Sequence, residues 1–231
     1  MEFKEPLIAV SLNDENYKEN LQKALRFGAD AVEYRIDGFK NKDLNHIKEV
    51  INFGNSLGLK AILTIRAKWE GGIEEVPNRL DYYYQLAPLV DFVDIELRAS
   101  EEEFQEVKRV VKCEEKKLIV SYHDFEKTPP EEELKEIFDR MVSKGADIAK
   151  VAYTAHSYDD VSRLLCVAAK QPIPTVAISM GEVGKISRVA GFAFNSVITY
   201  CALDRAFAPG QLTVSEAVEI LKKLGLKRTK T

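Results

Sequence analysis

One lysine stands in a stretch of sequence that otherwise has the pattern of a buried strand. In DIAKVAYTAH, residues 147–156, Lys150 shares a face with Ile148 and Ala152. Burial removes water from an ammonium group, and cations such as Arg66 disfavour it further, so we expect the pKa of Lys150 to be lowered. A neutral amine attacks carbonyl carbons, which makes Lys150 a candidate for Schiff-base formation. The alternative is a structural ion pair with a buried carboxylate.

A histidine and a glutamate are candidates for proton transfer beside this lysine. His123 stands near the end of KLIVSYHD, residues 117–124, which is the strand expected just before that of Lys150. Neighbouring strands are about 4.8 Å apart, so His123 is expected within reach of a substrate held on the lysine. Imidazole accepts and returns protons near neutral pH, although His123 would alternatively cap the strand end beside Asp124. Glu70 lies in a long acidic loop, KWEGGIEEVPN, after the third expected strand.

Two later loops carry groups suited to binding an anion. ISMGEVGKISRVAG, residues 178–191, places Lys185 and Arg188 at the start of a helix. A carboxylate or a phosphate would bind there, and the spacing does not choose between them. AFAPGQLT, residues 206–213, predicts either a lid that carries Gln211 or a simple Pro-Gly turn.

The elements that must position these residues repeat along the chain, as short β-branched runs that alternate with amphipathic helical stretches. Eight strands are predicted, at residues 7–12, 31–37, 60–66, 92–97, 117–124, 148–154, 175–180 and 197–203. Helices are predicted between them, for example at 16–28, 101–115, 130–145 and 213–225, and several are expected to end at a glycine: Gly28, Gly58, Gly145 and Gly225. This order predicts an α/β fold, a (β/α)8 TIM barrel forming a single domain over residues 1–231. A doubly wound sheet is the alternative, but no G-x-G-x-x-G follows the first strand.

Charged residues alternate with apolar ones in several of these strands and are expected on the inner face of the barrel. They gather toward the carboxyl ends of the strands, where barrel active sites are built. The alternative is a neutralised ion-pair network that fills the barrel mouth without chemistry. The residues concerned are Glu33, Arg35, Arg66, Asp94 and Glu96.

Composition narrows the classes of function. The 231 residues are 45% hydrophobic with a net charge of −4, so nucleic acid is not an expected partner. The sequence contains no run of about 18 apolar residues, which a membrane span would need. The charged start MEFKEPLIAVSLNDE does not resemble a signal peptide, so we expect a cytoplasmic protein. Cys113, Cys166 and Cys201 lack the spacing of a disulfide framework or zinc site and are expected to be buried apolar residues.

Six short motifs, taken in order, resemble the type I 3-dehydroquinate dehydratases: EYRID, TIRAKWEGG, SYHDF, IAKVAY, ISMGEVGKISR and APGQ. The resemblance covers nearly the whole chain. It implies dehydration of 3-dehydroquinate to 3-dehydroshikimate in the shikimate pathway, with no metal or nucleotide cofactor, by a homodimer that associates through its outer helices.

The resemblance also implies roles for particular residues. Lys150 would form the imine, and His123, oriented by Glu70, would move protons for a syn elimination. The residues implied to bind the substrate are Ser11, Glu33, Arg35, Arg66, Met180, Arg188 and Gln211. Phe207 departs from the family pattern, which has a serine two residues before the lid proline, and Arg98 has no role that the sequence explains.

Two rival interpretations remain at this stage. A class I aldolase would share the barrel and the lysine on the sixth strand but would bind phosphorylated sugars at GEVGKIS. It does not explain Glu70 with His123. A metabolite-binding or structural barrel would use Lys150 only as an ion-pair partner, and such a barrel does not need a proton shuttle beside an amine.

Overall fold

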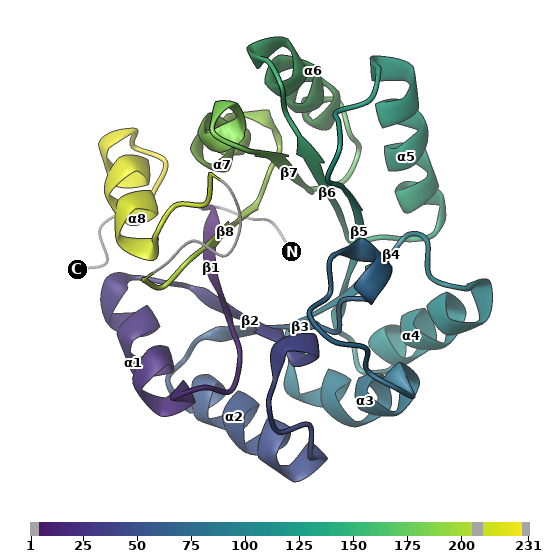
Figure 1. Cartoon of the computed structure of the whole chain (residues 1–231), viewed down its shortest axis with the longest axis vertical. Coiled ribbons are helices and arrows are strands. Elements are labelled where there is room, and N and C mark those ends of the chain that lie inside the picture. The colour runs from purple at the N-terminus through teal and green to yellow at the C-terminus, as the bar shows by residue number, and fades with distance from the viewer. Residues whose placement is uncertain (1–4, 205–209, 228–231) are drawn as a thin grey trace.

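A ring of parallel strands forms the centre of the computed structural model, which describes residues 5–204 and 210–227 (Figure 1). The strands are β1 (Leu7–Leu12), β2 (Ala31–Arg35), β3 (Lys60–Thr64), β4 (Phe92–Glu96), β5 (Lys117–Asp124), β6 (Ile148–Thr154), β7 (Thr175–Met180) and β8 (Ile198–Cys201). Each strand pairs with its neighbour in chain order, β8 pairs with β1, and a bridge between Thr175 and Ser196 joins the remaining edges. The predicted (β/α)8 barrel is confirmed.

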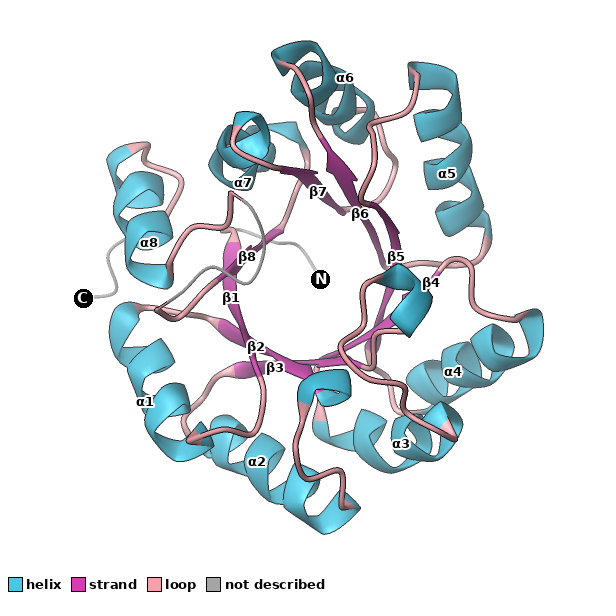
Figure 2. Ribbon diagram, viewed as in Figure 1, coloured by secondary structure: helices cyan, strands magenta, loops and turns pink. Residues whose placement is uncertain are grey.

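Helices surround this ring on its outer side (Figure 2). They are α1 (Tyr17–Phe27), α2 (Leu44–Ser56), α3 (Arg79–Leu86), α4 (Glu101–Cys113), α5 (Glu131–Ser143), α6 (Tyr158–Ala169), α7 (Ser187–Ala190) and α8 (Val214–Lys223). Helix α6 begins with a reciprocal capping box between Ser157 and Asp160. Helix α1 ends at Gly28, whose φ of 96° is a left-handed conformation that glycine adopts without strain.

Strands β2 and β3 end two residues earlier than predicted, and the buried carboxylate of Asp37 binds backbone groups that follow β3. Residues Ile36–Gly38 form a short 3-10 helix, η1, instead of continuing β2. The carboxylate of Asp37 accepts hydrogen bonds from the backbone N–H groups of Arg66 and Ile73. These groups are therefore satisfied outside the strand ladder.

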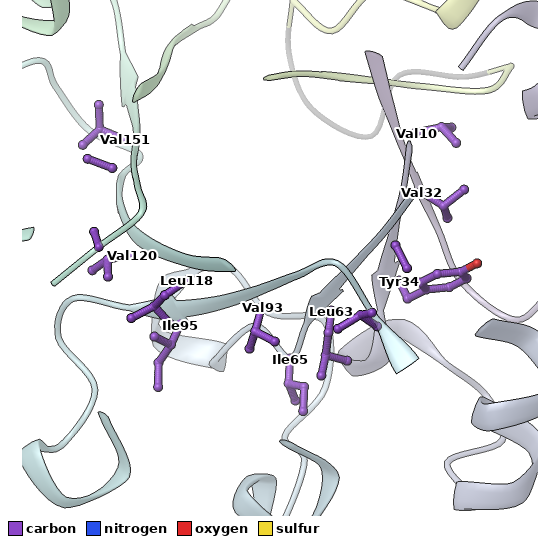
Figure 3. Packing of buried hydrophobic residues seen from close by; sticks show 14 of the residues in the cluster. Val10, Val32, Tyr34, Leu63, Ile65, Val93, Ile95, Leu118, Val120 and Val151 are labelled. Carbon is purple, nitrogen blue, oxygen red and sulfur yellow. The ribbon is translucent and has the colours of Figure 1, made fainter. Parts of the chain in front are cut away.

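Two apolar layers hold the barrel together. The outer layer lies between strands and helices and takes the outward side chains of the strands, among them Val32, Leu63 and Val93 (Figure 3). The inner layer forms the floor of the barrel and includes Ile62 and Ile148. Burial of apolar surface in both layers is the main force that stabilises this arrangement.

The inner face changes from apolar to polar toward the carboxyl end of several strands, such as β3 and β6, whereas that of β7 stays apolar. Because side chains on one face of a strand recur every second residue, Ile62 of the floor is followed by Thr64 and Ile148 is followed by Lys150. The parallel register sets Thr64 beside Asp94 and Ser121 beside Lys150. The fold thus builds a polar layer above an apolar floor, at the end of the barrel where active sites form.

Candidate active site

A cavity of about 370 Å³ lies at the carboxyl ends of the strands. The three predicted catalytic residues and the seven predicted substrate-binding residues all lie on its wall: Ser11, Glu33, Arg35, Arg66, Glu70, His123, Lys150, Met180, Arg188 and Gln211. They come from strands and loops along most of the chain, and the barrel brings them together. The volume is in the range of pockets that bind small molecules.

Lys150 projects from the middle of β6 and is held by acidic side chains. Its Nζ donates a hydrogen bond to Oδ2 of Asp94 at 2.9 Å and lies 3.4 Å from Oε1 of Glu33. The Nζ is also 4.0 Å from the centre of the Tyr200 ring, a cation–π contact. Burial favours a lower pKa of Lys150, but Asp94, Tyr200 and Glu33 outweigh burial and raise the pKa above its ordinary value.

The lowered pKa that we expected for Lys150 is therefore wrong for this state. The expectation counted the cationic neighbour Arg66, but the guanidinium of Arg66 is itself paired with Asp94, at 2.9 Å from Oδ1. The nearer charges around Lys150 are carboxylates, which favour the ammonium form. The ion-pair alternative describes the lysine here, and its use as a nucleophile requires a base that removes one proton first.

His123 and Glu70 form a hydrogen-bonded pair on the part of the cavity wall next to Lys150, because β5 pairs with β6. Glu70 closes a short 3-10 helix, η2 (Lys68–Glu70), and its Oε2 lies 2.9 Å from Nδ1 of His123. An ionised carboxylate there accepts a hydrogen bond from Nδ1–H and leaves Nε2 as the basic nitrogen. Burial and the positive charges of Arg66 and Lys150 lower the pKa of His123 well below its ordinary value, so the imidazole is neutral near pH 7.

Arg66 connects acidic groups of β4 and η2 with Ser121 of β5. Its guanidinium donates to Oδ1 of Asp94 at 2.9 Å and to Oγ of Ser121 at 2.7 Å. It also lies 3.3 Å from Oε1 of Glu96 and 3.8 Å from Oε2 of Glu70. Most of the donors of Arg66 are thereby engaged within the protein, which fixes its orientation at the cavity wall.

Glu33 and Arg35 line the neighbouring part of the wall, on β2. Glu33 accepts hydrogen bonds from Ser11 at 2.5 Å and from Thr64 at 2.9 Å. Burial favours a higher pKa of Glu33, but Lys150 and Arg35 outweigh burial and lower the pKa. Arg35 forms a two-pronged ion pair with Asp37, with distances of 2.9 and 2.7 Å.

Arg188 differs from the other cavity cations because no carboxylate pairs with it in the part of the chain that the structure describes. It is 5% exposed, donates to the backbone oxygen of Tyr200 at 3.2 Å, and its Nε has no hydrogen-bond partner there. Burial lowers its pKa, yet a guanidinium stays charged at neutral pH. Lys185 is exposed and lies outside the cavity lining. Of the two cations in this loop, Arg188 is thus the one placed to meet a bound anion.

The rest of the wall comes from β7 and the last loop. Met180 and Ile178 give it an apolar surface. Gln211 donates a hydrogen bond to the backbone oxygen of Tyr200 at 3.3 Å. The predicted lid includes Phe207, and residues 205–209 lie outside the described part of the chain.

Sequence reasoning missed some residues of the site. Tyr200 lies beneath Lys150, and the alternation of β8 would have indicated that it shares the inward face with Ile198. Phe125 stacks beside the His123 ring, with the ring centres 6.2 Å apart. Phe125 ends the motif SYHDF, but sequence reasoning assigned it no role, because it follows its strand in a loop.

Two of the three cysteines are not where the sequence predicted. Cys201 is buried in β8, but Cys113 and Cys166 are exposed on α4 and α6. Each stands on the solvent side of an amphipathic helix, where a small residue needs no burial.

In the described ranges no group of three or more His, Cys, Asp or Glu residues is arranged to hold a metal ion. No described helix combines the length and the apolar character that a membrane crossing requires.

Comparison with known proteins adds independent information. The family model described as Type I 3-dehydroquinase matches residues 8–228. The 3-dehydroquinate dehydratase of Aquifex aeolicus (strain VF5) is 49% identical over 217 residues, covering 94% of this chain and 98% of that protein. A crystal structure of the enzyme from Aquifex aeolicus VF5 matches with a TM-score of 0.89 at 48% identity, over 94% of this chain and 98% of that one.

A more distant solved structure matches equally well in fold. It is the type I 3-dehydroquinate dehydratase from Clostridium difficile with covalently modified comenic acid, at 30% identity and a TM-score of 0.88. The match covers 95% of this chain and 92% of that one. Because the family model and these relatives span almost the entire chain, this protein belongs to the type I 3-dehydroquinase family, a family of hydro-lyases.

Proposed function

We propose that this protein is a 3-dehydroquinate dehydratase that removes water from 3-dehydroquinate through a Schiff base on Lys150 and yields 3-dehydroshikimate for the shikimate pathway. The observation that carries the proposal is that Lys150 and the hydrogen-bonded pair of Glu70 and His123 line one cavity. The substrate follows from the name of relatives such as the Aquifex aeolicus enzyme. The covalently modified ligand of the Clostridium difficile relative supports a covalent route.

Imine formation begins with the proton on Lys150. His123 is neutral and takes this proton, and the free amine adds to the ketone carbon of the substrate. The same imidazole returns the proton to the resulting hydroxyl, which leaves as water and produces an iminium. Asp94 and Glu33, which hold the ammonium at 2.9 and 3.4 Å, then stabilise the iminium charge in the same place.

Elimination uses the imidazole a second time. His123 removes a proton from the carbon next to the iminium, and the electron pair flows to nitrogen to give an enamine. The enamine returns the pair and expels the hydroxyl from the adjacent carbon, and the imidazolium protonates this hydroxyl as it leaves as water. One group on one face performs both transfers, so the elimination is syn. A water molecule then hydrolyses the product iminium and restores the amine of Lys150.

The remaining wall residues bind and orient the substrate in this proposal. Arg188 clasps the substrate carboxylate, because it is a buried guanidinium without an acidic partner among the described residues. Gln211 closes over the carboxylate from the last loop. The residues that contact the ring and its hydroxyls are Ser11, Glu33, Arg35, Arg66 and Met180.

We propose further that the enzyme is cytoplasmic, needs no metal or nucleotide cofactor, and works as a homodimer that associates through outer helices. Sedimentation equilibrium tests the dimer, and a monomer mass at micromolar concentration would contradict it. Since no metal is needed in this proposal, we expect the enzyme to keep full activity after exhaustive dialysis against a chelator.

The decisive experiment traps the Schiff base. The protein is incubated with 3-dehydroquinate and borohydride, and intact and peptide masses are compared for wild type, Lys150→Ala and the control Lys185→Ala. We expect a reduced adduct on the peptide that contains Lys150, in wild type and the control alone. Turnover without an adduct would replace the imine with an enolate route, and a folded protein with neither turnover nor adduct would refute the proposed function.

A further inference from the structure

Arg98 follows β4 and contacts both members of the Glu70–His123 pair. Its Nε donates a hydrogen bond to Oε1 of Glu70 at 2.8 Å, while the other oxygen of this carboxylate faces Nδ1 of His123. Its Nη2 donates to the backbone oxygen of His123 at 3.2 Å. One guanidinium therefore holds both the carboxylate and the backbone of the histidine that the carboxylate orients.

Aromatic rings fix the guanidinium of Arg98 in this position. Its central carbon lies 4.6 Å from the centre of the Tyr122 ring and 5.3 Å from that of Trp69. Trp69 belongs to the same short helix η2 as Glu70, and Tyr122 precedes His123 on β5. Arg98 thus connects the loop after β3 with β5 through two hydrogen bonds and two cation–π contacts.

We infer that Arg98 is a positioning residue that keeps Glu70 ionised and aligned on Nδ1 of His123, so that Nε2 of the imidazole is the basic nitrogen. The arrangement extends the histidine–carboxylate pair by a third group outside the cavity lining. Arg98 does not itself line the cavity and acts only through Glu70 and His123. Its kinetic consequences rest on the proposed function, whereas its effect on the histidine does not.

The charge state of Glu70 depends on groups from each element packed around it. Burial raises the pKa of Glu70 to about 7, Arg66 from the end of β3 and Arg98 after β4 oppose this, and Glu96 on β4 adds to it. His123 on β5 faces Oε2. Because the pKa of Glu70 lies so near neutrality, the loss of one neighbouring cation raises this pKa above the working pH.

Protonation of Glu70 would reverse the roles of the imidazole nitrogens. A carboxylic acid donates a hydrogen bond from its O–H to Nδ1, and the neutral imidazole then carries its own proton on Nε2 and cannot act as the base. Activity that needs ionised Glu70 falls as the pH drops through the pKa of the pair. Removing the charge of Arg98 therefore shifts the acidic limb of the pH profile to higher pH.

Two substitutions separate charge from packing. Arg98→Gln removes the charge and keeps a hydrogen-bond donor of similar length, whereas Arg98→Lys keeps the charge and loses the planar fork. Arg109→Gln is a matched control, because Arg109 also pairs with a glutamate, Glu106 at 2.7 Å, and also lies against a tyrosine ring. That control pair is exposed on α4, away from the cavity.

The first measurement is the ¹⁵N spectrum of the histidine side chains against pH, without substrate. The chain has three histidines, so His123→Gln identifies the relevant resonances. We expect wild type, Arg98→Lys and Arg109→Gln to show mostly unprotonated Nε2 at pH 8, which is above the pKa of Glu70. In Arg98→Gln the pH at which the imidazole proton changes from Nε2 to Nδ1 should rise by roughly one unit, as expected for the loss of a nearby charge. An unchanged tautomer in folded Arg98→Gln would overturn the inference.

The second measurement is the pH dependence of kcat and KM with 3-dehydroquinate. Arg98→Gln should lower kcat about fivefold at pH 7 with little change in KM, recover toward wild type at high pH, and be rescued by Arg98→Lys. A pH-independent loss accompanied by a lower melting temperature in both variants would assign Arg98 a merely structural role. If wild type lacks dehydratase activity, the proposed function fails, and the spectra still decide the role of Arg98.

Discussion

The Nζ atom of Lys150 lies 2.9 Å from Oδ2 of Asp94, and Oδ1 of the same carboxylate accepts a hydrogen bond from Arg66, also at 2.9 Å. One buried carboxylate thus balances two buried cations. Burial favours a higher pKa of Asp94, but Arg66 and Lys150 outweigh it and hold the pKa well below the ordinary range. The charge of the lysine before substrate arrives is set by this carboxylate, with help from Glu33.

Asp94→Asn tests this balance. The substitution leaves two buried cations without their shared carboxylate, so we expect the free energy of unfolding in urea to fall by about 3–5 kcal/mol. It should also lower the pKa of Lys150, so that borohydride trapping persists at a lower pH than in wild type. Asp204→Asn is the control, because it removes only an exposed partner of Lys23 and should cost about 0–1 kcal/mol. Equal effects of the two substitutions would contradict the central role of Asp94.

The fold and the direction of the inner side chains followed from the sequence because both depend on local periodicity. Alternation with a period of two put Glu33 and Lys150 on the inner face, and the parallel register then fixed their height in the barrel. The cavity wall could therefore be predicted to a large extent from the residues at the carboxyl ends of the strands.

The charge state of the site could not be predicted in the same way. It depends on distances of a few ångströms between side chains from different strands, such as those from Lys150 to Asp94 and Glu33. Arg98 also had no account in the sequence, since its partners Glu70 and Tyr122 come from other loops and strands. The exposure of Cys113 and Cys166 likewise depends on which side of each helix faces the barrel.

Arg188→Gln tests the anion site. Hydrogen bonds to a charged group are worth about 1.5–3 kcal/mol, so the substitution should raise KM for 3-dehydroquinate roughly 10- to 100-fold. Arg188→Lys should recover part of the loss, because it keeps the charge without the planar fork. Lys185→Ala is the control and should leave KM unchanged. Normal KM in Arg188→Gln would mean that the substrate carboxylate binds elsewhere.

Glu70→Gln tests the orientation of His123. The amide preserves the shape of the carboxylate but removes the charge that holds the proton on Nδ1. By analogy with other histidine–carboxylate pairs, we expect kcat to fall roughly 10²- to 10⁴-fold, with a much smaller change in KM. Steady-state kinetics over a range of pH measures both constants. A loss confined to KM would show that Glu70 binds substrate instead of orienting the base.

The stability of the same variant reports on the proton shared by Glu70 and His123. Burial raises the pKa of Glu70 to about 7, and burial with nearby cations lowers the pKa of His123. Between about pH 4.3 and 6.5, the ordinary values for Glu and His, the folded pair holds one proton on Glu70 and the unfolded chain holds one on His123. The folded and unfolded states thus bind the same number of protons at these two residues. Titration of the pair should therefore leave the free energy of unfolding of wild type nearly independent of pH in this window.

Glu70→Gln removes the group that binds the proton in the folded state. The folded variant keeps His123 neutral while the unfolded chain protonates it below about pH 6.5, so stability should be full above that pH and fall as the pH drops, by up to about 1.4 kcal/mol per pH unit. Urea unfolding at half-unit steps from pH 4.5 to 7.5 measures the slope. Glu106→Gln, at an exposed glutamate, should keep the flat wild-type profile. A flat profile in Glu70→Gln would mean that His123 is protonated in the folded protein, which would remove it as the base in the free enzyme.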